Sequence, residues 1–291
     1  MERISEVRPP YTLEFYKIIY DFHAKGSGVR DEAWDAGTGI GNVAVELASS
    51  GFKHIWATDP SQSHIGKAHK YIDAAGCKEK ITTKVAKAED GIDAPDGSID
   101  LVTVAEALHW TDWQKVVKAA ALKVKPGGTF AAWIYGVHCF FVDPAYAQAQ
   151  GAYDQIFLEW VRLLFKKMTQ TASGSCMQSR FDCVEFESKD WKDVHRIHWA
   201  SDHTTTGPGS VAHIDSRVGP DDTVERHTGI GTMVVHANVD WMAGFLDNLY
   251  PDLKMSDICS DEFARLRDLM GGKEAKLQVA WPHTLVMARR K

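Results

Sequence analysis

A glycine-rich turn that follows an acidic residue is the most informative chemical feature of the sequence. In the segment WDAGTGIGNVAVELA, Asp35 is followed by Gly37, Gly39 and Gly41 at two-residue intervals and then by a helical pattern. Glycine lets a backbone turn tightly and approach a ligand, and a helix start offers unpaired N–H groups. A dinucleotide-binding GxGxxG loop would have an apolar residue before its first glycine, whereas here Asp35-Ala36 precedes Gly37. It would also have a third glycine where Asn42 stands. The spacing therefore favours a ligand without a pyrophosphate.

A second acidic residue, Asp59, ends the next apolar stretch, in IWATDPSQS. A carboxylate at the end of this strand can accept hydrogen bonds from both hydroxyls of a ribose. The same residue could instead cap the helix that begins after Pro60. Because Asp59 comes in register after the glycine turn, the ribose role is favoured.

His109 and Trp110 follow a later apolar stretch, in AEALHWTDW. An imidazole with an ordinary pKa near ~6.5 suits a general base, so His109 is a catalytic candidate. A histidine here could also hold a loop by hydrogen bonds, and this structural role is favoured over the base. Trp110 is expected to form an aromatic wall of the pocket, although a tryptophan beside a strand end is also common in a core.

The remaining metal-ligand residue types do not predict a metal site. The loop residues concerned are His203, His213, His227, His236, Asp215, Asp221 and Asp222. No histidine pair among them has the i, i+3 or i, i+4 spacing typical of a built site, so we expect solvated side chains and no metal. The cysteines Cys77, Cys139, Cys176, Cys183 and Cys259 contain no CxxC pair, which favours reduced, structural thiols.

Alternating strand and helix patterns position these residues. Strands are predicted at 32–36, 54–58, 81–85, 99–105 and 128–134, and helices at 12–23, 43–50, 62–75 and 113–122. Strands that alternate with helices at this spacing form βαβ units. We therefore expect an α/β, Rossmann-like fold with a mostly parallel sheet and helices on both faces.

The rhythm changes after Gly136. A long amphipathic helix is predicted at 145–168, and its aromatic face includes Trp160, which would contact substrate if this helix covers the pocket. Residues 204–231 are typical of a long ordered loop or an irregular hairpin. Residues 277–289 are typical of a final strand whose Pro282 fits an edge or a bulge. We expect a core of residues 1–136 and 273–291 and a mostly helical cap of residues 137–272.

Composition excludes several classes of function. The 291 residues are 44% hydrophobic and 25% charged, and the formal charge of -6 comes without a basic cluster. This composition favours a globular domain and argues against nucleic acid as a partner. The N-terminal sequence has no apolar stretch of the length that a signal peptide or a membrane span requires. We expect a cytoplasmic monomer or homodimer without a membrane partner.

The ordered motifs identify a family. RPPY, DAGTGIG, ATDPS, KAEDG, PDGSIDLVTVAEALHW and VKPGGTFAAW resemble those of class I S-adenosylmethionine (AdoMet)-dependent methyltransferases, in the subgroup similar to trans-aconitate methyltransferases and related fungal small-molecule enzymes. The resemblance covers residues 8–136. It implies a seven-stranded sheet, AdoMet as cofactor, and methyl transfer to an oxygen (carboxylate or hydroxyl) or nitrogen of a small organic molecule, with secondary metabolism as a setting.

The resemblance also implies which residues surround AdoMet. The implied set is Tyr11, Asp35, Gly37, Thr38, Gly39, Asp59, Ser61, Ala88, Glu89 and Ala105. The glycine turn would face the methionine part, Asp59 would hold the ribose, and Ala88 and Glu89 would flank the adenine. Ala105 would offer its carbonyl to the ammonium of the ligand. Glu106 departs from the family, which often has glutamine there, and this added carboxylate near the sulfonium makes it a second catalytic candidate.

Two other functions stay open at this point. The chain could bind AdoMet without transferring its methyl group, as a non-methylating catalyst or a binding module. A nicotinamide-dependent oxidoreductase is favoured by the glycine turn and Asp59 but opposed by Asp35 and by the missing third glycine. For methyl transfer itself, positioning supplies most of the rate, and only a hydroxyl or amine acceptor would benefit from a base.

Overall fold

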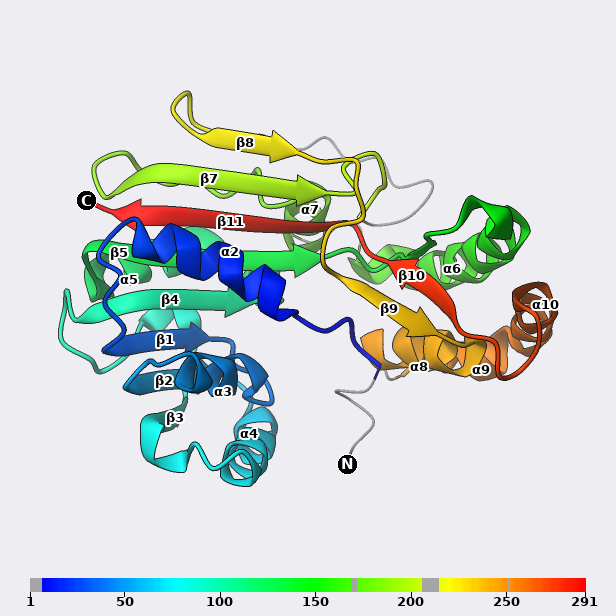
Figure 1. The fold of residues 1–291 in the computed structure, drawn as a ribbon, viewed down its shortest axis with the longest axis horizontal. Coiled ribbons are helices and arrows are strands. Elements are labelled where there is room, and N and C mark those ends of the chain that lie inside the picture. The colour runs from blue at the N-terminus through cyan, green and yellow to red at the C-terminus, as the bar shows by residue number, and fades with distance from the viewer. Residues whose placement is uncertain (1–6, 169–171, 206–214, 251) are drawn as a thin grey trace.

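An eight-stranded sheet forms the centre of the computed structural model, which describes residues 7–168, 172–205, 215–250 and 252–291 (Figure 1). Its strand order is β3-β2-β1-β4-β5-β11-β7-β8. The strands are β1 (Glu32–Ala36), β2 (His54–Asp59), β3 (Ile81–Val85), β4 (Ile99–Ala105), β5 (Val124–Tyr135), β7 (Trp191–Trp199), β8 (Thr223–Arg226) and β11 (His283–Arg290). The strands β1 to β5 are parallel, whereas β11 is antiparallel to both of its neighbours. The expected Rossmann-like fold is confirmed, with one strand more than expected.

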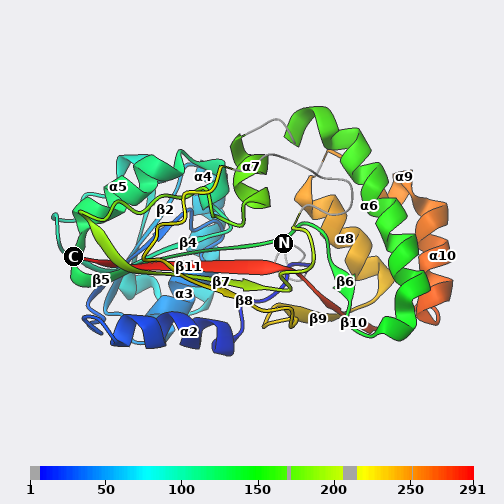
Figure 2. The ribbon, with the colours of Figure 1, turned by 90° about the horizontal axis from the view of Figure 1, so that it is seen from above.

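Four helices accompany the parallel strands. They are α2 (Leu13–Ala24), α3 (Asn42–Ser49), α4 (Gln62–Ala74) and α5 (Trp113–Lys123). Helices α2 and α5 both pack against β5 and lie on opposite faces of the sheet (Figure 2). Three of the helices begin at a side-chain cap, from Thr12, Ser61 and Asp112, whose oxygens accept a backbone N–H of the first turn. Local sequence signals thus set where these helices start.

A second group of elements stands at one end of the sheet (Figure 1). It contains α6 (Ala147–Met168), α7 (Ala172–Gln178), α8 (Val239–Leu249), α9 (Met255–Ile258), α10 (Ser260–Met270), β6 (Phe140–Phe141), β9 (Val234–Ala237) and β10 (Leu277–Ala280). The strands form a small sheet of order β6-β10-β9. Short 3₁₀ helices are η1 (Lys78–Lys80), η2 (Ala88–Asp90), η3 (Leu108–Trp110) and η4 (Pro144–Tyr146). None of the helices in the described ranges has both the length and the apolarity needed to cross a bilayer.

The C-terminal strand differs from its prediction. Residues 277–289 form two strands in different sheets, β10 and β11, and Pro282 lies between them rather than at an edge or a bulge. Proline has no N–H for a sheet and restricts the residue before it, so the chain changes sheets here. The adjoining Trp281 is fully buried at this junction.

The cap range of 137–272 remains a prediction, and part of it joins the central sheet. Strand β7 pairs with β11, and β8 pairs with β7, so both extend the core. Strand β8 also lies within 204–231, which was expected to be a long ordered loop or an irregular hairpin, and it pairs in parallel with β7. Residues 206–214 of that segment are outside the described ranges.

A buried arginine holds β7 in place. Arg196 is 1% exposed, and its guanidinium donates to the carbonyls of Phe181 at 2.8 Å and Val184 at 2.9 Å and to Asp222 Oδ2 at 2.8 Å. Buried polar groups are costly when they lose their partners. Arg196 therefore fastens the segment before β7 and the loop before β8 to the sheet.

We expect Arg196→Met to lower the free energy of unfolding by about 3–5 kcal/mol, because the substitution leaves Asp222 as an unpaired buried charge. Urea unfolding measures this difference. Arg226→Met is the matched control, since Arg226 is 58% exposed in its side chain and pairs with Asp182 at 3.5 Å. An exposed pair contributes less than about 1 kcal/mol, so equal losses in the two variants would contradict the assignment.

Candidate functional site

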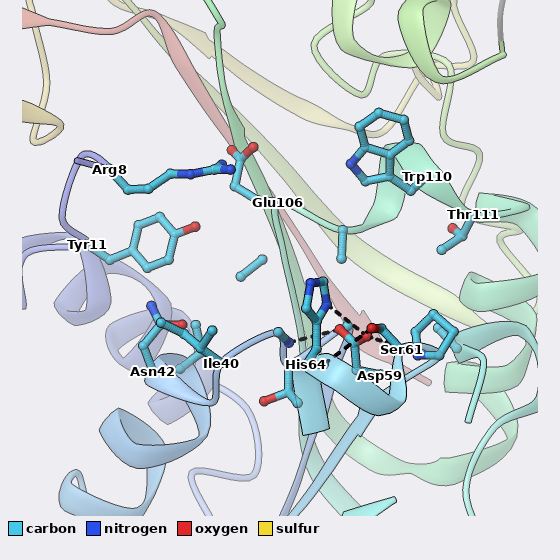
Figure 3. A pocket seen from close by; sticks show the side chains of 18 of the residues that line it. Arg8, Tyr11, Ile40, Asn42, Asp59, Ser61, His64, Glu106, Trp110 and Thr111 are labelled. Atoms are coloured by element: carbon cyan, nitrogen blue, oxygen red, sulfur yellow. Dashed lines mark hydrogen bonds and ion pairs between the residues drawn. The ribbon is translucent and has the colours of Figure 1, made fainter. Parts of the chain in front are cut away.

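A cavity of about 970 Å³ opens at the carboxyl ends of the parallel strands (Figure 3). Its walls come from the ends of β1, β2, β4 and β5, from the starts of α3 and α4, from η2 and η3, and from the N-terminal segment. Because the chain runs outward from β1 to β2 and β3 and then returns to β4, the loops on either side of β1 diverge and leave a crevice. Its size is at the upper end of the ~300–1,000 Å³ range of small-molecule sites.

Most of the residues predicted from the sequence line this cavity. They are Tyr11, Gly37, Thr38, Gly39, Asp59, Ser61, Ala88, Glu89, Ala105, Glu106 and Trp110. Asp35, His109 and Trp160 are not among the lining residues. The structure adds others that the sequence analysis missed, among them Arg8, Asn42, His64, Lys87, Thr111 and Tyr135.

The glycine turn is fastened to β2. The N–H groups of Gly37 and Thr38 both donate to the carbonyl of Thr58, each at 2.8 Å. Gly37 has a φ of 73°, and a Cβ built on it would lie 2.4 Å from the Cβ of Ala107. Only glycine fits this conformation and this approach to the loop after β4.

Asp35 holds the glycine turn by hydrogen bonds from the end of β1. It is fully buried and accepts hydrogen bonds from Thr38 Oγ1 at 2.6 Å and from Thr103 Oγ1 at 2.8 Å. Burial raises the pKa of Asp35 to about 6, while the two hydroxyl groups oppose this rise. Its side chain thus joins the turn to β4.

Asp59 is held with its carboxylate at the cavity wall. Its Oδ2 accepts the N–H of Gly39 at 3.0 Å, and its Oδ1 accepts the N–H of Ser61 at 2.8 Å and lies 3.1 Å from His64 Nδ1. A carboxylate offers about four acceptor positions, and a ligand with two adjacent hydroxyls needs two of them. The His64 side chain is half exposed, so it is the partner that such a ligand can displace most easily.

An ionisable carboxyl and a guanidinium lie together at the other end of the cavity, where β4 and β5 end. Glu106 Oε1 accepts the backbone N–H of Tyr135, and Arg8 Nη1 donates to Tyr135 Oη at 3.0 Å. Arg8, Tyr11 and Glu106 converge on this end in Figure 3. Burial raises the pKa of Glu106 to about 8, and the Tyr135 N–H and the Arg8 charge act in the opposite direction. A carboxyl and a guanidinium therefore stand together in a partly dry environment.

His109 and Trp110 are neighbours with different surroundings. Trp110 is 67% exposed and lines the cavity, whereas His109 is 4% exposed and lies behind the wall. Burial lowers the pKa of His109 to about 3, and the nearby Arg8 charge adds to this effect. Such an imidazole is a weak base, and its buried Nδ1 has no hydrogen-bond partner among the described residues, so both the catalytic role and the loop-holding role remain predictions.

Trp160 lies in α6 and is 3% exposed, with its ring 5.3 Å from that of Phe157. Its side chain packs within the cap, and its predicted contact with substrate stays a prediction. Among the described residues, no group of three or more His, Cys, Asp or Glu side chains could hold a metal ion, and His213 lies outside them.

The missed residues carried weak sequence signals. Tyr135 ends a strand, as Ala105 does, and the carboxyl ends of parallel strands are where ligands bind in such sheets. His64 lies one turn into the helix that follows Asp59. Arg8 is part of RPPY, but nothing in that motif shows which strand end it approaches.

Comparison with known proteins gives concordant relatives. Residues 33–128 match a family model described as a methyltransferase domain. The chain is 31% identical to methyltransferase cfoB of Aspergillus candidus over 98% of this chain and 92% of that one. It is 29% identical to methyltransferase pgmE of Aspergillus terreus over 97% and 91%. A solved structure of a proposed type II methyltransferase from Anaeromyxobacter dehalogenans is similar in fold, with a TM-score of 0.62, 19% identity and 97% of each chain covered.

The raised pKa of Glu106 makes stability depend on pH. Its contribution to stability is fully present below the ordinary pKa of 4.5 and is lost as the pH rises through about 8. Between pH 6 and pH 8 the free energy of unfolding should fall less steeply with rising pH in Glu106→Gln than in the unaltered protein. The two slopes should differ by at most about 1.4 kcal/mol per pH unit. Denaturant unfolding at several pH values measures both slopes.

Taking the difference between the two proteins cancels the contributions of Asp35, His109 and other groups that titrate in both. The exposed Glu79→Gln should leave the slope unchanged and serves as the control. Identical slopes in Glu106→Gln and the unaltered protein would show that Glu106 ionises as an ordinary glutamate.

Proposed function

We propose that this chain, which belongs to the class I AdoMet-dependent methyltransferases, transfers the methyl group to an oxygen (carboxylate or hydroxyl) or nitrogen of a small organic molecule, in secondary metabolism. The observation that carries the proposal is one continuous cavity. The end at Asp59 suits a nucleoside, and the other end carries charged and aromatic side chains. The fungal relatives named above are methyltransferases, and their similarity over nearly the whole chain supports methyl transfer.

The residues of the cavity fit AdoMet by their chemistry. The carboxylate of Asp59 suits two ribose hydroxyls, and the loop around Ala88 and Glu89 at the end of β3 suits the adenine. The strand order then requires the ligand to cross the glycine turn above β1 before it reaches β4. A side chain on Gly37 would fill the place where the turn meets Ala107.

The charged end of the cavity would hold the amino-acid part of the ligand. An α-amino acid group carries an ammonium and a carboxylate close together, and this end presents an acid and a base of complementary charge. Arg8 would hold the carboxylate, and Glu106 with the carbonyl of Ala105 would hold the ammonium. Tyr11 would close this end from the N-terminal segment.

Bound AdoMet supplies a methyl group that is already activated by the positive sulfur, so the protein has mainly to position the acceptor and exclude water. Trp110 offers an exposed aromatic face for this purpose. A carboxylate acceptor needs no base, whereas a hydroxyl or amine acceptor benefits from one. His109, with a pKa of about 3, is a weak base for this purpose.

Turnover with a panel of small carboxylic acids, phenols and amines tests the function. We expect S-adenosylhomocysteine and a methylated acceptor to form in equal amounts with at least one class, measured by mass spectrometry. The unaltered protein without acceptor is the control. Tight AdoMet binding without S-adenosylhomocysteine from any class would favour a non-methylating protein, and binding of NAD alone would favour an oxidoreductase.

Asp59→Asn tests the ribose assignment. The variant keeps one acceptor oxygen but loses the charge, so we expect AdoMet to bind about 10–100 times more weakly, as for loss of hydrogen bonds to a charged group. Isothermal calorimetry measures the affinity, and Asp93→Asn is the control because the Asp93 side chain is 74% exposed on the surface. Unchanged affinity in Asp59→Asn would remove the ribose role.

A further inference from the structure

We propose that Glu106 couples donor binding to proton release and makes the cavity prefer the positively charged AdoMet over the neutral product S-adenosylhomocysteine. The inference rests on the proposed function, since it assumes that AdoMet occupies this cavity. It goes further by assigning a charge-selecting role to one side chain of the wall.

The backbone aims the Glu106 side chain into the cavity. Glu106 has a φ of 51°, in the left-handed region that a residue with a side chain rarely adopts. Its N–H donates to the carbonyl of Trp133 at 3.0 Å, and its Oε1 accepts the N–H of Tyr135. One bond from the Glu106 backbone and one to its carboxyl thus fasten this strained residue to β5 and hold the carboxyl at the cavity wall.

The position in the sheet places Glu106 at the end of the cavity opposite the ribose-type carboxylate. Strand β2, which carries Asp59, and strand β4, which precedes Glu106, lie on either side of β1. Adjacent strands are about 4.8 Å apart, so the two carboxyl groups stand on opposite sides of the glycine turn. A nucleoside held at Asp59 must therefore extend its charged part towards Glu106.

The surroundings of Glu106 favour its protonated form in the empty protein. Among the described residues, the groups that face it are Arg8 and Tyr11 of the N-terminal segment and Tyr135 of β5, of which only Arg8 is a cation. The guanidinium of Arg8 also donates to Tyr135 Oη. With its pKa raised to about 8, Glu106 is mostly protonated near pH 7 in the empty protein.

Binding of a cation changes this balance. A positive charge within about 4–6 Å of a carboxyl lowers its pKa by about 1–3, so a bound ligand that carries a sulfonium and an ammonium ionises Glu106. The proton goes from the carboxyl to solvent, and no covalent bond is made or broken. S-adenosylhomocysteine has the ammonium but no sulfonium, so it stabilises the ionised carboxyl less and binds more weakly for this reason.

Calorimetric titrations in two buffers with different protonation enthalpies, at pH 7, count the protons released on binding. We expect the unaltered protein to release more than about half a proton with AdoMet and clearly less with S-adenosylhomocysteine. In Glu106→Gln, proton release should fall close to zero, and the preference for AdoMet should decrease by about 5–10 times. Glu14→Gln, an exposed substitution in α2, should retain both properties.

The outcomes separate this inference from the proposed function. Failure of the unaltered protein to bind AdoMet would overturn both. AdoMet binding without proton release, or a Glu106→Gln variant with unchanged release and unchanged preference, would overturn the inference alone. If Glu106→Gln does not fold, the difference in proton release between the two ligands on the unaltered protein decides the question, and equal release would refute the role of Glu106.

Discussion

The arrangement of the cavity depends on the buried carboxylate of Asp35. Asp35 in β1 stands opposite Thr103 of β4 in the register of the sheet, and it accepts the hydroxyl of that residue and the hydroxyl of Thr38. An acceptor-only group suits two hydroxyl donors, which an amide in the same place would match less well. These bonds hold the glycine turn against β4, so that Gly37 packs against Ala107. This contact leaves no room for a side chain at Gly37.

Once the turn is fixed, the two ends of the cavity follow from the strand order. Asp59 ends β2 on one side of β1, and Glu106 follows β4 on the other, so a ligand that reaches both must lie across the turn. The N-terminal segment completes the second end. Tyr11 and Phe15 each pack their rings 5.4 Å from Trp133 of β5, and this packing positions the segment that carries Arg8. The charged end therefore combines Arg8 of the N-terminal segment with Tyr135 at the end of β5.

Local signals in the sequence were sufficient for the parallel strands and not for the rest of the sheet. Strand β2 was predicted at 54–58 and spans His54–Asp59, because apolar stretches bounded by turn residues are local features. Strand β7 was missed because its pairing with β11 joins positions such as His198 and Thr284, and because a buried Arg196 obscures its pattern. The same reason explains Arg8, which reaches Tyr135 only in the folded chain. The order of the motifs placed Asp35 among the residues expected around the ligand. Residue type and spacing, however, do not distinguish a carboxylate that supports a turn from one that faces a ligand.

The two sides of the cavity are under different physical constraints. The side that holds the glycine turn and Asp59 is formed by backbone turns and carboxylates at the ends of parallel strands, so it has little freedom to vary. The other wall includes Trp110, which belongs to η3, and η3 packs against α7 at the edge of the cap. The position of the exposed indole thus depends on a contact with α7, while Asp59 ends β2 and Glu106 directly follows β4. The described residues that line the cavity all lie between Arg8 and Tyr135, so the predicted cap acts on the cavity only through the elements that it packs against.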